Sequence, residues 1–141
     1  MKALLLLCCC LLGATLGWGA PSMHTKGAKP LSISQGQPVN LTDFIVTGKI
    51  TLFEFTSEYC PPCRAFAEVL LQLHQQSADL AVVKVDINRP EVHKIDWQSP
   101  VAQQYGLQSI PFFKIVGPNG QLIAEGKPAR DQVDAWIAQL R

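Results

Sequence analysis

The stretch ITLFEFTSEYCPPC, residues 50–63, decides the fold of this chain. Its first seven residues are mostly β-branched, aromatic or aliphatic and predict a strand. Cys60 and Cys63 follow, and the spacing of apolar residues after them predicts a helix over residues 64–76. Cysteines three residues apart on a first helical turn lie on one face, close enough for a disulfide. Because unpaired N–H groups at a helix start lower the pKa of a thiol there, the pattern indicates a reversible dithiol rather than a structural staple.

The bulk properties describe one ordinary globular domain with an apolar segment added. The chain has 141 residues, of which 48% are hydrophobic and 16% are charged, a length that suits one domain rather than two. The net charge of +1 falls to zero without Lys2, because 11 Lys and Arg residues then balance 11 Asp and Glu residues. This balance predicts neither a nucleic-acid partner nor binding to an anionic membrane surface.

Residues 1–19 predict a secretory signal peptide, cleaved near Gly19. Lys2 is followed by an apolar run of about a dozen residues and then by small residues, while Pro21 argues against cleavage directly after Ala20. The run is short for a transmembrane helix. An uncleaved or lipid-modified N-terminus is the alternative, because the run contains three consecutive cysteines, although no small residue precedes the first of them.

Cleavage would leave Cys60 and Cys63 as the cysteines of the mature protein, out of five in the chain. Because residues 1–19 predict a signal peptide, we expect an exported protein, located in a bacterial periplasm, with secretion or membrane anchoring as alternatives. Disulfides persist in such compartments. A zinc half-site is the competing interpretation of the pair, but the three histidines of the mature chain stand at no useful spacing, so no metal is expected.

The remaining pattern predicts a flexible lead-in over residues 20–39, rich in Ser, Gly, Pro and Lys, and a domain over residues 40–141. Beyond residues 50–76, the predicted elements are a short helix after Asn40, a buried strand at 80–87, a brief helix from Pro100 to Gly106, a hairpin of 112–116 and 121–125, and a helix at 131–140. Their order predicts an α/β fold with a central mixed β-sheet and helices on both faces.

This domain resembles the thioredoxin-fold family, in particular its exported thiol–disulfide oxidoreductases. The resemblance rests on the strand–Cys-x-x-Cys–helix order, on Ile110-Pro111 at the start of a strand, and on Gly126 before the last helix. It implies a thioredoxin fold and an enzyme without a cofactor that reduces protein disulfides through the Cys60–Cys63 dithiol.

By position, Cys60 is expected to be the exposed nucleophile and Cys63 the buried resolving thiol, an asymmetry that thiol–disulfide exchange needs. Pro61 and Pro62 stand between them and stiffen the turn. In this family the residues between the cysteines tune the redox potential. A Pro-Pro pair lacks the histidine of the strongly oxidising enzymes, so we expect a reducing or intermediate potential.

Glu54, in the strand before the cysteines, matches a buried acid that relays the proton of the resolving cysteine in thioredoxins. Burial would raise its pKa, as that task needs. Lys84 matches a lysine that pairs with this acid in the family. The competing interpretation is that both are solvated strand residues, with Glu54 at a sheet edge.

The resemblance also assigns three residues to substrate binding. Ile110-Pro111 is expected to contain a cis peptide bond beside the cysteines, leaving the backbone of Ile110 free to pair with substrate. Tyr59 stands where thioredoxins usually carry Trp and would keep an aromatic rim. Trp97 is interpreted as packing on the core rather than joining that rim, and His74 and His93 as surface residues.

The expected partners are proteins that carry disulfides or dithiols, and a redox partner, for which a membrane electron donor is one candidate. A monomer is expected. Two other functions stay open. One is a disulfide oxidase or isomerase. The other is a redox-inactive binding module, which the intact cysteine pair disfavours.

Overall fold

The computed structural model describes residues 24–140. The predicted signal peptide, residues 1–19, lies outside this part of the chain. None of the helices in residues 24–140 is long and apolar enough to span a membrane. The elements in chain order are β1 (Leu31–Ile33), the 3-10 helix η1 (Leu41–Phe44), β2 (Ile50–Thr56), α1 (Pro61–Gln76), β3 (Leu80–Asp86), α2 (Pro100–Gln104), β4 (Phe112–Val116), β5 (Leu122–Glu125) and α3 (Lys127–Ile137).

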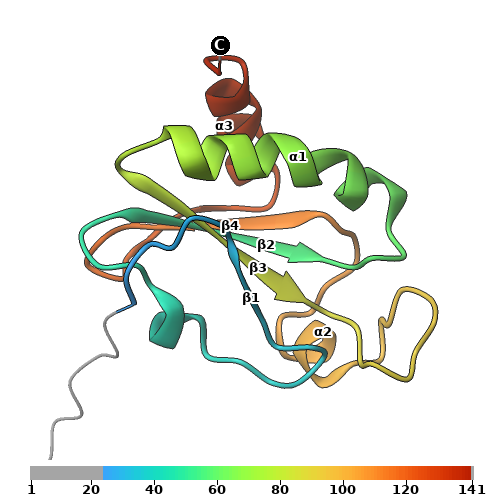
Figure 1. The fold of residues 1–141 in the computed structure, drawn as a ribbon. Coiled ribbons are helices and arrows are strands. Elements are labelled where there is room, and N and C mark those ends of the chain that lie inside the picture. Colours follow the sequence, from blue (N-terminus) through green and yellow to red (C-terminus); the bar gives the residue numbers. More distant parts are fainter. Residues whose placement is uncertain (1–23, 141) are drawn as a thin grey trace, which may run out of the picture.

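The strands form one mixed sheet in the order β1-β3-β2-β4-β5. β3 pairs in parallel with β1 and β2, whereas β4 pairs antiparallel with β2 and β5. Helices α1 and α3 cover one face of the sheet, while α2 and η1 lie on the other (Figure 1). The predicted α/β architecture, with a mixed sheet between helices on both faces, is confirmed.

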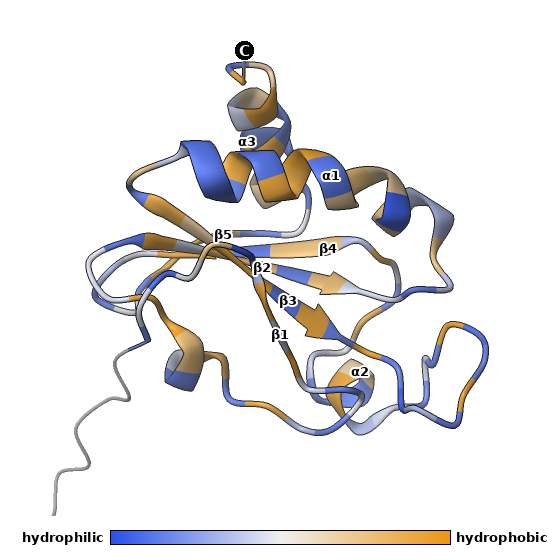
Figure 2. Ribbon diagram, viewed as in Figure 1, coloured by the Kyte–Doolittle hydropathy of each residue, from blue (hydrophilic) through white to orange (hydrophobic). Residues whose placement is uncertain are grey.

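Each face of the sheet has its own hydrophobic core, which explains why the central strands are apolar on both sides. In β2, Phe53 and Phe55 point toward α2, and Leu52 points toward α1 and α3. Hydrophobic residues accordingly dominate the strands and the sheet-facing side of α1 (Figure 2). Alternation along β2 also places Glu54 on the α1 face, beside Leu52 in an apolar layer.

The prediction of a flexible lead-in over residues 20–39 is wrong for its described part. β1 forms the edge of the sheet, with Leu31 opposite Val83 and Ile33 opposite Val85. A three-residue strand in a segment rich in Ser, Pro and Gly is too short to show a period in the sequence. Its pairing partner also lies about 50 residues away, so local sequence does not reveal it. Gly36 follows with φ +79°, and a Cβ there would lie 2.7 Å from the backbone nitrogen of Arg89. Only glycine fits this close approach.

Several helix boundaries also differ from expectation. The final helix spans Lys127–Ile137 rather than residues 131–140, and it starts earlier because Gly126 serves as its N-cap and Pro128 fits its first turn. α1 starts at Pro61, directly after Cys60. The first helical residue therefore lies between the two cysteines.

Candidate active site

The two cysteines form a disulfide at the start of α1, just after the connection from β2. Cys60 is the N-cap residue of α1, and its Sγ accepts a hydrogen bond from the backbone N–H of Cys63 at 3.2 Å. The Cα atoms of the joined residues are 5.2 Å apart. Pro61 and Pro62 fill the intervening helical positions, where a backbone N–H would have no intrahelical partner. The disulfide therefore forms between the N-cap residue and the first turn of α1, and the helix remains regular.

Cys60 is not exposed in this disulfide form, contrary to the expectation for the nucleophile. Its exposed fraction is 1%, and that of Cys63 is 2%. The Sγ of Cys60 lies 3.7 Å from the carbonyl oxygen of Ile110, which precedes β4, so the loop before β4 covers it. Position at a helix start does not imply exposure when a neighbouring loop packs over the sulfur.

The Ile110–Pro111 peptide bond is cis and leads directly into β4. Ile110 and Pro111 are both half-buried. The structure thus brings the Ile110–Pro111 pair next to Cys60, which lies about 50 positions earlier in the sequence.

Glu54 is fully buried, with an exposed fraction of 0%, and neither carboxylate oxygen has a hydrogen-bond partner. Lys84 stands opposite Glu54 in the parallel pairing of β2 and β3, on the face covered by α1. Burial raises the pKa of Glu54 to about 7, against the opposing effects of Lys84 and the nearby Thr56 hydroxyl. A solvated position for Glu54 at a sheet edge is therefore wrong.

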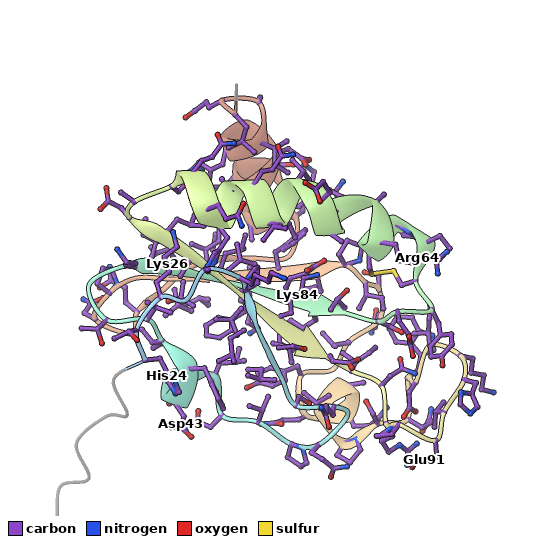
Figure 3. All side chains as sticks on the ribbon, viewed as in Figure 1. His24, Lys26, Asp43, Arg64, Lys84 and Glu91 are labelled. Carbon is purple, nitrogen blue, oxygen red and sulfur yellow. A yellow bond between two sulfur atoms is a disulfide. The ribbon has the colours of Figure 1, made fainter. Side chains whose placement is uncertain are left out.

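Lys84 and Cys63 border one small hollow beside α1, which links the carboxylate's neighbour to the resolving cysteine. Figure 3 shows Lys84 beneath α1 and the disulfide at the start of that helix, near Arg64. The hollow is lined by Ser32, Thr56, Ser57, Glu58, Cys63, Arg64, Ala67, Lys84 and Asp86. Through this hollow, Lys84 and Cys63 both border the surface of the molecule.

Tyr59 lies half-buried next to Cys60 and faces the connection between β3 and α2. Its hydroxyl is hydrogen-bonded to Nδ1 of His93 at 3.1 Å. Partial burial and the carboxylates of Glu58 and Asp86 raise the pKa of Tyr59. Trp97 packs against the core, as interpreted from the sequence, and it also contributes to the surface hollow in front of Tyr59.

A buried polar cluster of Ser57, Asn88 and Asp96 was missed by the sequence analysis. The Ser57 hydroxyl donates to Oδ1 of Asn88 at 2.6 Å and accepts the N–H of Tyr59 at 3.2 Å. The available signal was a polar residue close after the end of each of two neighbouring parallel strands, Ser57 directly after β2 and Asn88 two residues after the end of β3, because the carboxyl ends of such strands meet at one edge of the sheet. The cluster fixes the backbone one residue before Cys60.

His74 is buried within α1, so its interpretation as a surface residue is wrong. Its Nδ1 accepts the N–H of Val82 at 3.0 Å, and its Nε2 donates to the carbonyl oxygen of Gly27 at 2.9 Å. Burial lowers the pKa of His74. In residues 24–140, no group of three or more His, Cys, Asp or Glu side chains is placed to hold a metal ion.

Comparison with known proteins agrees with this geometry. Residues 34–139 match the family model described as Thioredoxin. The H-type thioredoxin of Brassica oleracea is 27% identical over 91 residues, which cover 64% of this chain and 68% of that protein. The thioredoxin of Chlamydia caviae is 36% identical over 72 residues, which cover 51% of this chain and 62% of that protein.

Among solved structures, the short form of thioredoxin f from spinach chloroplast has a TM-score of 0.56. It shares 20% sequence identity and covers 82% of this chain and 97% of its own, a likeness that bears on the fold alone. The predicted thioredoxin fold is thereby confirmed. The chain belongs to the thioredoxin family, and its Cys60–Cys63 pair supports thiol–disulfide redox chemistry.

Proposed function

We propose that this protein reduces disulfides in other proteins, with Cys60 as the attacking thiol and Cys63 as the resolving thiol. The observation that carries the proposal is the disulfide itself, which joins the N-cap of α1 to its first turn. The sulfur of Cys60 lies against the carbonyl of Ile110, so a substrate that reaches this sulfur meets the backbone of Ile110 next to it. Cys63 lies one turn deeper and is placed for the second step.

The chemistry is two successive exchanges. The thiolate of reduced Cys60 attacks a substrate disulfide, forming a mixed disulfide and releasing one substrate thiolate, which takes up a proton. Cys63 then gives up its proton and attacks the Sγ of Cys60. This step forms the Cys60–Cys63 disulfide and releases the second substrate thiol, so the substrate gains the two electrons that the protein loses.

Glu54 is proposed to take the proton from Cys63. A buried carboxylate whose pKa is about 7 can exchange protons near neutral pH, whereas an ordinary glutamate cannot. Lys84, opposite Glu54 and on the hollow that reaches Cys63, is proposed to carry the proton onward to solvent.

Electrons are proposed to flow from this protein to its substrates, so that the substrate disulfides are reduced. Neither Pro61 nor Pro62 brings a charged side chain or a backbone N–H that would stabilise a Cys60 thiolate, as a strong oxidant would need. A disulfide oxidase or isomerase is the alternative. In support of a reductase partner, a structure of similar fold (TM-score 0.55, 18% identity) is described as a complex of ferredoxin:thioredoxin reductase with thioredoxin f2.

We also propose that the protein is exported, with the periplasm as its location. The support is the sequence pattern of residues 1–19, namely a basic start, an apolar run and a small-residue exit. Expression of the full chain in bacteria, followed by fractionation and intact-mass measurement, checks this. A mass that retains residues 1–19, in the cytoplasmic fraction, would reject it.

The redox proposal is tested by insulin reduction with dithiothreitol as the electron source. Wild-type protein should accelerate insulin precipitation, Cys60→Ser should show only the background rate, and Cys63→Ser should accumulate a mixed disulfide. Equilibration of the pair with glutathione measures direction. A strongly oxidising equilibrium would favour the oxidase, and full activity of Cys60→Ser would reject the assigned chemistry.

A further inference from the structure

The connection between β3 and α2, residues 87–99, lies beside the cysteine pair but has no part in the exchange chemistry. In Figure 1 this connection projects at the end of the sheet where β2 leads into α1. Figure 3 places Glu91, near its tip, at that same end of the molecule.

Buried polar side chains hold the connection rigidly. The Oδ1 atom of Asn88 accepts from Ser57 and from the N–H of Asp96, while its Nδ2 donates to the carbonyls of Val92 at 2.9 Å and Lys94 at 2.7 Å. The carboxylate of Asp96 also accepts two hydrogen bonds from the Arg89 guanidinium, at 2.7 and 3.0 Å. A fully bonded network of this kind fixes the shape of the segment before any ligand arrives.

The connection and Tyr59 together form a shallow hollow of about 570 Å³. We name it the Tyr59 hollow, and its walls are Tyr59, His93, Lys94, Ile95 and Trp97. Three of its walls are aromatic rings, one is aliphatic and one is the cationic side chain of Lys94, and none is a carboxylate. The hydrogen bond between Tyr59 and His93 fixes the wall nearest the cysteines.

We propose that the Tyr59 hollow binds a bulky apolar side chain that flanks the reactive cysteine of a polypeptide substrate. This inference rests on the proposed reductase function. When a substrate sulfur is bonded to Cys60, the neighbouring substrate residues must pass within a side-chain length of Tyr59, the preceding residue. A preformed aromatic hollow at that place gains the burial of an apolar side chain without first ordering its own walls.

The kinetic test uses two peptide disulfides that differ only beside the cysteine. One is the symmetric disulfide of Ser-Phe-Cys-Phe-Ser and the other that of Ser-Ser-Cys-Ser-Ser. For the wild type, kcat/KM should be about tenfold higher for the phenylalanine peptide. Trp97→Ala should reduce this ratio to less than about twofold, Trp97→Phe should keep most of it, and His93→Ala, at an exposed position, should reduce it about threefold. Ile123→Ala, in β5, is the control and should leave the ratio unchanged.

A binding measurement separates this proposal from the redox proposal. The oxidised protein, labelled with ¹⁵N, is titrated with the same peptides carrying serine in place of cysteine. Saturable shifts of the Trp97 indole and of the amides of residues 93–97 are expected with the phenylalanine peptide alone. Such shifts without reduction of either peptide or of hydroxyethyl disulfide would reject the reductase function and retain the hollow. Equal kcat/KM values, a ratio that survives both Trp97→Ala and His93→Ala, or absent shifts would overturn the inference.

Discussion

The fold contains two buried polar centres that are built in opposite ways. Glu54 has no hydrogen-bond partner for either carboxylate oxygen, whereas the side chain of Asn88 makes four hydrogen bonds. Both belong to strands or strand ends of the same parallel pair, so their difference does not arise from separate parts of the fold.

This difference indicates different roles: the hydrogen-bonded Asn88 supports the structure, whereas the unbonded Glu54 is suited to exchange a proton. A satisfied polar network stabilises one arrangement of the chain, since each lost bond would leave another buried group unpaired. An unsatisfied carboxylate costs free energy, and it persists where a proton must be gained and lost. Burial alone therefore does not tell which role a polar residue has, but the count of its partners does.

Removal of the Asn88 side chain should have the largest effect on stability. Asn88→Ala deletes four hydrogen bonds and removes the partner of the Ser57 hydroxyl proton, of the Asp96 N–H and of two partly buried carbonyl groups. We expect a loss of about 4 kcal/mol in the free energy of unfolding, measured by urea denaturation of the oxidised protein. Gln132→Ala, at an exposed position of α3, is the control and should change stability by less than about 0.5 kcal/mol. A loss below about 1 kcal/mol for Asn88→Ala would mean that the network contributes little.

Glu54→Gln should change stability in the opposite direction, and only at higher pH. The pKa of Glu54 is about 7 in the folded protein against an ordinary value of 4.5, so the folded state binds more protons between these values. The free energy of unfolding of the wild type therefore falls as pH rises from 4.5 to 7, by about 3 kcal/mol in total. The variant lacks this loss, so it should match the wild type near pH 4 and exceed it at pH 8. A difference that does not depend on pH would contradict the raised pKa.

The same Glu54→Gln substitution should slow disulfide reduction. Without the carboxylate, Cys63 loses its proton unaided, so turnover near neutral pH should fall by about tenfold and recover partly at higher pH. Stopped-flow fluorescence or insulin turnover across pH measures this. An unchanged pH profile would leave Glu54 as a costly strand residue with no part in the reaction.

His74 is a buried titratable group that, unlike Glu54, has both ring nitrogens hydrogen-bonded. Its pKa is lowered in the folded state, so the unfolded state binds more protons and stability falls as pH drops below about 6.5. Protonation removes the acceptor for the N–H of Val82, worth about 1 kcal/mol. Comparison of His74→Gln with its parent at pH 7 and pH 5, both carrying Glu54→Gln, isolates this slope. His93→Gln, at an exposed position, should leave the slope in place.

Lys84→Met should produce the smallest effect. Lys84 lowers the pKa of Glu54 in opposition to burial, so its removal should raise that pKa further. Carboxyl ¹³C chemical shifts followed across pH report the value directly. Lys127→Met, on α3, provides a matched loss of charge far from Glu54 and should not move its titration. A fall in the pKa of Glu54 would show that Lys84 does not act on it as a nearby cation.

Local patterns were enough to predict most of the scaffold. β2 and β4 have the predicted bounds, and Ser99 caps α2 with Pro100 at its first position. These elements depend on neighbouring residues, such as a β-branched run or a capping side chain, so the sequence around them carries the information.

Apart from the start of α3, the missed features depend on partners outside their own segment of the chain. β1 forms only against β3, His74 is buried by Gly27 and Val82, and Cys60 is covered by Ile110. The Asn88 cluster likewise joins the ends of two strands, so the sequence of its own segment, taken alone, resembles a polar surface loop. The placement of such side chains is a property of the folded topology rather than of local composition.

Most helices begin on a capping group whose character is constant, such as a serine hydroxyl or an asparagine carbonyl. α1 begins on a sulfur atom that belongs to a redox couple, because Sγ of Cys60 accepts the Cys63 N–H. In the oxidised protein this acceptor is a neutral disulfide sulfur, and after reduction and ionisation it becomes an anion facing the positive end of the helix. The strength of this helix cap therefore depends on the redox state of Cys60, and we expect the backbone order of the first turn of α1 to change with it.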